Sequence, residues 1–135
     1  MPQSLRIALV EDNPVDVFFF QIALEDAGVP CELVAYDSTA ELLAALPCER
    51  RFDLIVTEWF LRSSDAPRLF SEIRTLPEHA ETPIVIASAF WDAPPEATAA
   101  GAFHYLTKAI DPPQIVALLT KLANRRSAQR YSTVP

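Results

Sequence analysis

Several short apolar runs of this 135-residue chain end in side chains that could carry out chemistry. Some are carboxylates, and carboxylates that lie close together repel one another unless a cation stands between them. Oxygen-rich acidic clusters suit a hard cation such as Mg²⁺. A hydroxyl and an ammonium group would complete the parts that hold a phosphoryl group beside a metal ion. The residues are Glu11 and Asp12 after Leu5–Val10, Glu58 after Leu54–Thr57, Ser88 at the end of Ile84–Ser88, and Lys108 after Phe103–Leu106.

Each of these residues also has an ordinary structural interpretation. An acidic pair after a strand is usually a solvated helix start, a single serine caps a helix, and a single lysine is a surface charge. All of them, however, stand at the ends of strands in the order that one site would need. This joint occurrence favours a functional site.

The elements that would position these residues are five apolar, β-branched runs with helix-like stretches between them. Asn13 caps the first helix, which begins at Pro14 and ends before Gly28. Ser38 and Glu41 form a capping box for the second helix. The predicted strands are Leu5–Val10, Glu32–Tyr36, Leu54–Thr57, Ile84–Ser88 and Phe103–Leu106, and the predicted helices are Pro14–Ala27, Thr39–Leu46, Ala66–Thr75, Pro95–Ala100 and Pro112–Asn124.

Strands that alternate with helices predict right-handed crossovers and one α/β domain with a doubly wound parallel sheet. Nearly continuous apolar strands support this prediction, because both faces of such a sheet are covered by helices. Five strands suggest the flavodoxin-like (βα)5 fold with the order 2-1-3-4-5. In that order the topological switch lies between strands 1 and 3, and the site belongs at their carboxyl ends.

The composition narrows the classes of function. A formal net charge of −7 disfavours nucleic acid and anionic membrane as partners, because both need a basic footprint. No apolar run has the length of a membrane span and no signal pattern is visible, so we expect a cytoplasmic location. Cys31 and Cys48 lack metal-site spacing and are expected to be reduced thiols. Residues 125–135 are polar and basic, and we expect a disordered tail there.

The same segments resemble the receiver domain of bacterial response regulators over about residues 5–123. The resemblance lies in the acidic start, the third strand, the fourth strand with its hydroxyl residue, and the fifth strand with its aromatic residue and lysine. It implies a receiver domain over residues 1–124 that acts alone in two-component phosphorelay signalling and is not an enzyme. The stretches that carry it are Leu9–Pro14, Asp53–Thr57, Pro83–Ala89 and Gly101–Lys108.

The resemblance also implies a metal site and partners. Glu11 and Asp12 would bind Mg²⁺. Glu58 and the backbone carbonyl of Phe60 would complete the site. The implied partners are a sensor histidine kinase or phosphotransfer protein and a downstream effector protein. Whether the chain also forms a homodimer stays open.

The acceptor position is the main departure from the receiver pattern. Glu58 stands where the phosphoryl-accepting aspartate is expected, and its carboxylate reaches about 1.5 Å further. Ser88 would hydrogen-bond the phosphoryl group, Lys108 would pair with it, and Tyr105 would be the aromatic output switch. A misplacement of about 1 Å can lower a rate on the order of 10²-fold. We therefore expect an atypical receiver that ordinary aspartyl phosphorylation does not switch.

Further departures lie around the site. Ala109 follows the lysine in place of a proline whose peptide bond is often cis, so Lys108 is expected to sit differently. Arg62 and Ala66 replace a proline and a glycine after the third strand. The helix Pro95–Ala100 is shorter than usual, which puts the common output surface in doubt.

Two other functions stay open. One is a conventional receiver in which Glu58 or a neighbouring acid still accepts phosphate. The other is a Mg²⁺-dependent phosphohydrolase on a similar fold, which lacks the nucleophilic aspartate that it would need. Incubation with a phosphoryl donor tests the first alternative, and turnover of phosphate esters tests the second.

The first helix carries three consecutive phenylalanines. Because neighbouring helical residues point about 100° apart, one helix face cannot bury all of them. Phe19, with Val15 and Ile22, fits the core face. Phe18 or Phe20 should then be partly exposed, either against a neighbouring helix or as a partner or dimer patch.

Further predictions concern the two histidines and an aromatic pair. His79 and His104 belong to no ligand constellation and are expected at the surface. Phe90-Trp91 follows the fourth strand directly. This pair would be either a lid over the site or an anchor for a partner.

Overall fold

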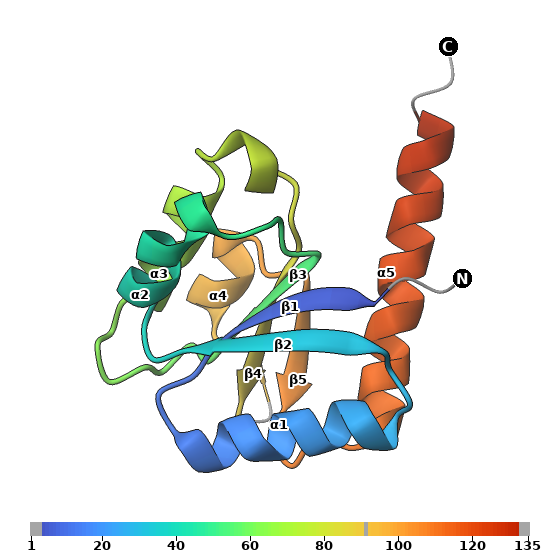
Figure 1. Cartoon of the computed structure of the whole chain (residues 1–135), viewed down its shortest axis with the longest axis horizontal. Coiled ribbons are helices and arrows are strands. Elements are labelled where there is room, and N and C mark those ends of the chain that lie inside the picture. The colour runs from blue at the N-terminus through green and yellow to red at the C-terminus, as the bar shows by residue number, and fades with distance from the viewer. Residues whose placement is uncertain (1–3, 91, 133–135) are drawn as a thin grey trace.

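A computed structural model of the protein describes residues 4–90 and 92–132. It contains a five-stranded parallel sheet with the order β2-β1-β3-β4-β5 and helices on both faces (Figure 1). This is the flavodoxin-like arrangement that the alternation of elements predicts. The strands are β1 Leu5–Val10, β2 Cys31–Tyr36, β3 Leu54–Thr57, β4 Ile84–Ser88 and β5 His104–Thr107; the helices are α1 Pro14–Asp26, α2 Thr39–Ala45, α3 Ala66–Ile73, α4 Pro95–Ala100 and α5 Pro112–Ser132, with short 3-10 helices at Leu46–Cys48 and Pro77–His79.

The sheet separates two hydrophobic cores. One core lies beneath α2, α3 and α4 and contains the fully buried Phe52 and Leu69. The other lies beneath α1 and α5 and contains Phe20 and Leu118. Both β3 and β4 are buried along their whole length, so their carboxyl ends are held firmly at one edge of the sheet. Within the described parts of the chain, no helix has the length and apolarity that a membrane span requires.

The predicted helix caps are present. Asn13 Oδ1 accepts a hydrogen bond from the Val15 amide at 3.0 Å, which orients the start of α1 beside the end of β1. At α2, Ser38 Oγ accepts from the Glu41 amide at 3.1 Å. The Glu41 carboxylate accepts from the Asp37 amide at 2.9 Å, one residue before the cap position of a standard capping box.

The buried face of α1 differs from the prediction. Phe20 is 4% exposed and belongs to the core, whereas Phe19, expected there, is 59% exposed. Val15 is also exposed, as is Phe18, which agrees with the expectation for that residue. Adjacent phenylalanines offer two overlapping apolar stripes at helical spacing, so the period alone cannot choose between them. The neighbouring Ala23 and Leu24 decide the face, since they pack with Phe20 against the sheet.

His79 was expected at the surface and is instead 4% exposed. It ends a 3-10 helix that turns its ring inward, where Nδ1 lies 3.1 Å from Thr82 Oγ1. This hydroxyl satisfies a ring nitrogen that burial would otherwise leave without a partner. His104 is half-buried in β5, so it too departs from the surface expectation.

The expected disordered tail is also wrong for residues 125–132, because α5 continues to Ser132. Two of the basic side chains that suggested a solvated end contact the rest of the domain. Arg125 donates to the Glu81 carbonyl at 2.6 Å and lies over the Phe103 ring. Arg126 faces Asp53 across 3.8 Å. Beyond these contacts the end of α5 projects from the domain (Figure 1).

The two faces of α1 give a direct test of the packing. We expect Phe20→Ala to lower the free energy of unfolding by about 3 kcal/mol, because it leaves a cavity in a closed core. Phe19→Ala removes the same atoms from an exposed position and should cost less than about 1 kcal/mol. Urea unfolding followed by circular dichroism measures both. Equal losses in the two variants would contradict this assignment of the faces.

Candidate functional site

The carboxyl ends of β1, β3, β4 and β5 bring most of the predicted site residues together. Backbone hydrogen bonds hold this edge: the Glu58 amide donates to the Val10 carbonyl at 3.0 Å, and the Lys108 amide donates to the Ser88 carbonyl at 2.7 Å. Glu11, Glu58 and Ser88 are buried. Carboxylates such as those of the two glutamates are seldom buried unless they have partners. The edge therefore holds a compact polar site inside the domain.

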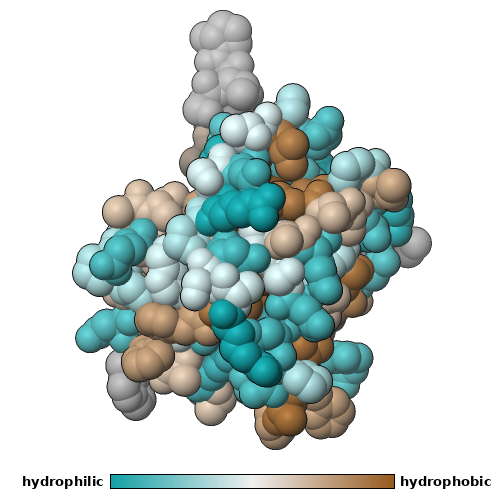
Figure 2. All heavy atoms as spheres, turned by 90° about the vertical axis from the view of Figure 1, so that its left-hand side faces the viewer, coloured by the Kyte–Doolittle hydropathy of each residue, from teal (hydrophilic) through white to brown (hydrophobic). Residues whose placement is uncertain are grey.

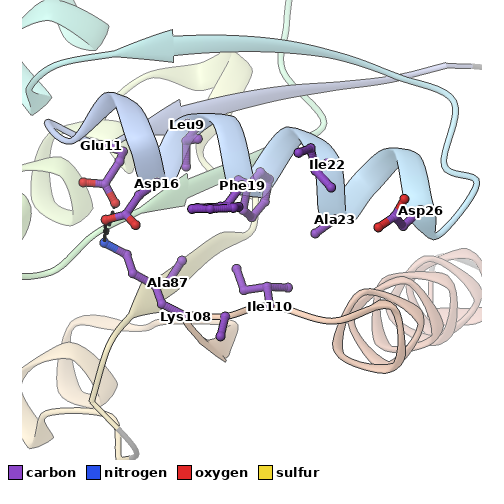
Figure 3. A pocket seen from close by; sticks show the side chains of 12 residues that line it. Leu9, Glu11, Asp16, Phe19, Ile22, Ala23, Asp26, Ala87, Lys108 and Ile110 are labelled. Carbon is purple, nitrogen blue, oxygen red and sulfur yellow. Dashed lines mark hydrogen bonds and ion pairs between the residues drawn. The ribbon is translucent and has the colours of Figure 1, made fainter.

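The Lys108 ammonium group lies at the centre of this site (Figure 3). Its Nζ is 2.6 Å from Glu11 Oε1 and 2.7 Å from Asp16 Oδ2. The distance from Nζ to Glu58 Oε1 is longer, at 3.8 Å. Lys108 thus turns toward α1 and meets the acceptor position only at the limit of an ion pair.

Asp16 is the site residue that sequence reasoning missed. It lies in the first turn of α1, where a carboxylate is favoured by the amides of the helix start. That position is itself an ordinary explanation for an acid, which is why the residue did not stand out. The signal that could have found it is the short spacing from Glu11 across a capped turn, which returns the chain to the same edge of the sheet.

Asp12 has a separate partner. Its Oδ2 accepts a hydrogen bond from the Arg62 amide at 2.7 Å and lies 3.7 Å from Arg62 Nε. Arg62 is one of the residues that depart from the receiver pattern after the third strand. It reaches the site from the loop after β3, so the two neighbouring acids of β1 face different basic groups.

Glu58 and Ser88 leave polar atoms without partners. Glu58 Oε2 and Ser88 Oγ are both buried, and neither makes a hydrogen bond to any residue in the described ranges. Burial raises the pKa of Glu58, attraction by Lys108 opposes this, and repulsion from Glu11 adds to it. The acceptor position therefore carries an incompletely satisfied carboxylate in a low-dielectric pocket.

Burial and neighbouring charges also shift the pKa values of Glu11 and Lys108. Burial raises the pKa of Glu11, although its bonds with Lys108 oppose the change. For Lys108, burial alone would lower the pKa, but hydrogen bonds to Asp16 and Glu11 and attraction to the acids together raise it. Lys108 is accordingly a firmly charged ammonium group among carboxylates.

Ala109 leaves the lysine on a strained backbone. No peptide bond in residues 4–90 and 92–132 is cis, and Ala109 has a φ of 67°. A left-handed conformation is unfavourable for alanine, so the turn must be held by its surroundings. The turn follows Lys108 directly, and a placement of the lysine different from that of the receiver pattern stays a prediction.

Tyr105 and two phenylalanines close the opposite side of the site. The Tyr105 hydroxyl donates to the Phe90 carbonyl at 2.6 Å, and its ring packs against the first core. The Phe90 ring lies on the Phe60 ring with centroids 4.8 Å apart. These contacts join the loops after β3 and β4 through side chains that are half-exposed. Trp91 lies outside the described residues, and whether the Phe90-Trp91 pair is a lid or a partner anchor stays a prediction.

The proposed Mg²⁺ ligands do not fit a metal ion in this arrangement. Mg²⁺ requires near-octahedral oxygen ligands at about 2.0–2.1 Å. The Lys108 ammonium group stands between Glu11 and Glu58, and Asp12 is directed at Arg62 instead. Across the described residues, no three His, Cys, Asp or Glu side chains are grouped as metal ligands. The metal-binding roles of Glu11, Asp12, Glu58 and Phe60 stay a prediction.

A hollow of about 390 Å³ lies beside the acid–lysine cluster, between α1 and the chain after β5 (Figure 3). Its wall is largely apolar and includes Phe19, Phe20 and Ile110. Asp16 and Lys108 line one end and Asp26 lies at the other. The site thus opens toward an apolar groove on the α1 side of the domain.

Comparison with known proteins identifies the class. Residues 7–120 match the family model of the response regulator receiver domain. The chain belongs to this family, whose members are modules of two-component signal transduction. Among curated relatives, the cyclic di-GMP phosphodiesterase response regulator RpfG of Xanthomonas campestris pv. campestris is 29% identical over 126 residues. The alignment covers 91% of this chain but 33% of RpfG, so the chain spans about a third of that relative.

Solved structures agree with this assignment. The phosphorylated cyanobacterial phytochrome response regulator RcpA is 27% identical, with a TM-score of 0.69 over 86% of this chain and 89% of that one. The receiver domain of the sensor histidine kinase PA1611 from Pseudomonas aeruginosa shares the fold at 22% identity, with a TM-score of 0.73 over 89% and 98% of the two chains. That structure has a magnesium ion coordinated in its active-site cleft.

The raised pKa of Glu58 has a consequence for stability. Between its ordinary value of 4.5 and the raised value, the folded protein holds more protons than the unfolded chain. The free energy of unfolding therefore falls as pH rises through this window, and the loss persists at neutral pH. Glu58→Gln removes the buried charge and should raise the free energy of unfolding by about 1 kcal/mol near pH 7.5, with little gain near pH 4.

Urea unfolding at the two pH values measures this effect. Glu25→Gln removes the same charge from an exposed position of α1 and serves as the matched control. The control should change the free energy of unfolding by less than about 0.5 kcal/mol at either pH. A lower stability of Glu58→Gln at neutral pH would contradict the account of a strained buried carboxylate.

Proposed function

We propose that this protein is an atypical receiver that acts through contacts with other signalling proteins and is not switched by ordinary aspartyl phosphorylation. The observation that carries the proposal is the buried Glu58 at the end of β3, with Lys108 held by other acids. A receiver needs its acceptor carboxylate, hydroxyl and lysine aimed at one phosphoryl group. Here the lysine lies within 2.7 Å of Glu11 and Asp16 and 3.8 Å from Glu58.

Geometry supports a loss of acceptor function. In-line phosphoryl transfer depends on positioning and on charge stabilisation, with little other help from the protein. The extra methylene group of Glu58 moves its carboxylate along the pocket, where Oε2 is already enclosed. A phosphoryl group attached there would have to share this space with the Lys108 ammonium group and the loop after β4.

One observation favours the alternative of a conventional receiver that accepts phosphate. Ser88, Lys108 and three carboxylates of the expected set all lie at the same sheet edge. Under this alternative, Glu58 or a neighbouring acid would accept phosphate after a rearrangement of the site. One experiment distinguishes the two functions.

Incubation with acetyl phosphate and Mg²⁺, followed by intact mass spectrometry, is that experiment. We expect no adduct with the mass of one phosphoryl group, roughly 80 Da. A receiver domain with an acceptor aspartate serves as the positive control, and Glu58→Gln serves as the matched negative control. A stoichiometric adduct on the natural protein would overturn the proposal and establish the conventional alternative. Its absence from Glu58→Gln would assign the acceptor to Glu58, and its persistence there would assign it to a neighbouring acid.

The exposed stripe of α1 is the surface that we propose for the partner. Val15 is 56% exposed, and Phe18 and Phe19 are each 59% exposed. With Ile22 they recur at helical spacing on α1, and Phe19 and Ile22 also line the groove beside this helix. Hydrophobic residues form separate patches among hydrophilic ones in Figure 2, including one at the lower edge, the level at which α1 lies in Figure 1. A histidine kinase, phosphotransfer protein or effector with an apolar helix face would suit this stripe.

Paired variants test the surface. We expect Phe18→Ser together with Phe19→Ser to abolish binding of the histidine kinase or phosphotransfer protein that the natural protein retains in pull-down from its own cells. Val116→Ser changes a similarly exposed apolar residue on α5 and should leave this binding unchanged. Mass spectrometry of the retained proteins gives the comparison. Retention of the same partner by the double variant would exclude the α1 stripe as its binding surface.

A further inference from the structure

The acids of the site are occupied by the protein's own cations. Glu11 and Asp16 are bound by Lys108 Nζ at 2.6 and 2.7 Å. The Lys108 side chain is 19% exposed, and the side chain of Glu11 is 4% exposed, so both are largely removed from solvent. Salt screens such buried ion pairs weakly, and breaking one of them leaves an uncompensated buried charge. Lys108 therefore places a positive charge among Glu11, Asp16 and Glu58, where it would repel a metal cation that approached the same carboxylates.

Arg62 binds Asp12, the other acid that follows β1. It holds Asp12 through its backbone amide at 2.7 Å and through its guanidinium group at 3.7 Å. The guanidinium group is mostly exposed, so the amide bond is the more persistent part of this contact. Together, Lys108 and Arg62 divide the two neighbouring acids of the expected metal site between separate partners.

Asp16 determines where the lysine lies. With Glu11 it forms a pair of short contacts on the α1 side, whereas Glu58 offers a single long one. Asp16 Oδ2 is also a hydrogen-bond acceptor for Nζ at 2.7 Å. Without Asp16, the ammonium group would keep one short contact and could move toward Glu58. Asp16 is therefore a positioning residue for Lys108.

We propose that Lys108, positioned by Asp16, is the resident cation of this receiver and excludes Mg²⁺ from its acid cluster. The inference rests on the proposed function and supplies a physical reason for it, because phosphoryl transfer relies on a metal ion to neutralise developing charge. A divalent ion entering the cluster would meet an ammonium group within a few ångströms and would have to displace it from Glu11.

Nuclear magnetic resonance of the ammonium groups tests this directly. The chain has two lysines, Lys108 and Lys121, so a sample with ¹⁵N-labelled lysine gives two side-chain signals. Lys121→Met assigns them. We expect the Lys108 signal to be observable near neutral pH, because its ion pairs slow exchange with water, and to be unchanged by millimolar Mg²⁺. In Asp16→Asn it should shift or broaden. Displacement of the Lys108 signal by Mg²⁺ in the natural protein, or an unaltered signal in Asp16→Asn, would overturn the proposal.

Calorimetric titration with MgCl₂ gives an independent measurement. We expect no saturable binding of millimolar Mg²⁺ to the natural protein, and a gain in affinity of about ten-fold or more in Lys108→Met, because a like charge is removed from the cluster. Lys121→Met makes the same change of charge at a remote site and should behave as the natural protein. Saturable binding to the natural protein, or equal affinity of the two variants, would overturn the proposal.

Failure of this inference and failure of the proposed function are distinguishable. The magnetic resonance and calorimetric experiments contain no phosphoryl donor and report only on the cation. If Mg²⁺ displaced Lys108 while acetyl phosphate gave no adduct, the atypical receiver would stand and the resident-cation inference would fall. If acetyl phosphate gave an adduct on Glu58 while Lys108 stayed in place, the proposed function would fall instead.

Discussion

The ion pairs of Lys108 are the interaction on which the site depends. Glu11 and Glu58 are buried carboxylates, and a buried charge without a partner is among the most unfavourable features a fold can contain. Lys108 satisfies the first at short range and attracts the second at longer range. Two further features lie beside these ion pairs. Glu58 keeps an unsatisfied oxygen, and the backbone after Lys108 turns through the left-handed Ala109.

The fold could be predicted from the sequence because several local signals agree. The apolar runs, the caps at Asn13 and Ser38, and the alternation of strands with helices all lead to one sheet order. The same signals placed Glu11, Glu58, Ser88 and Lys108 at one sheet edge. This part of the site depends only on where strands end, and strand ends are readable from apolar runs.

The remaining features depend on tertiary contacts that no local pattern records. The period of α1 fits two adjacent faces, and only packing against the sheet selects Phe20 over Phe19. Arg125 suggested a solvated tail, yet its contacts with Glu81 and Phe103 extend α5. Asp16 looked like a favourable acid at a helix start, and its bond to Lys108 joins residues far apart in the chain. Local sequence patterns do not predict such long-range pairs.

The receiver framework is retained around a site in which Lys108 and Arg62 of the protein itself bind the acids that follow β1. The most direct measurement is a crystal structure of the protein grown with Mg²⁺ and beryllofluoride, which mimics a bound phosphoryl group. The account predicts that Lys108 stays between Glu11 and Asp16, with neither magnesium nor beryllofluoride bound at the carboxyl ends of β1 and β3. Beryllofluoride on Glu58 with Mg²⁺ held by Glu11 and Asp12, and Lys108 turned toward them, would contradict it.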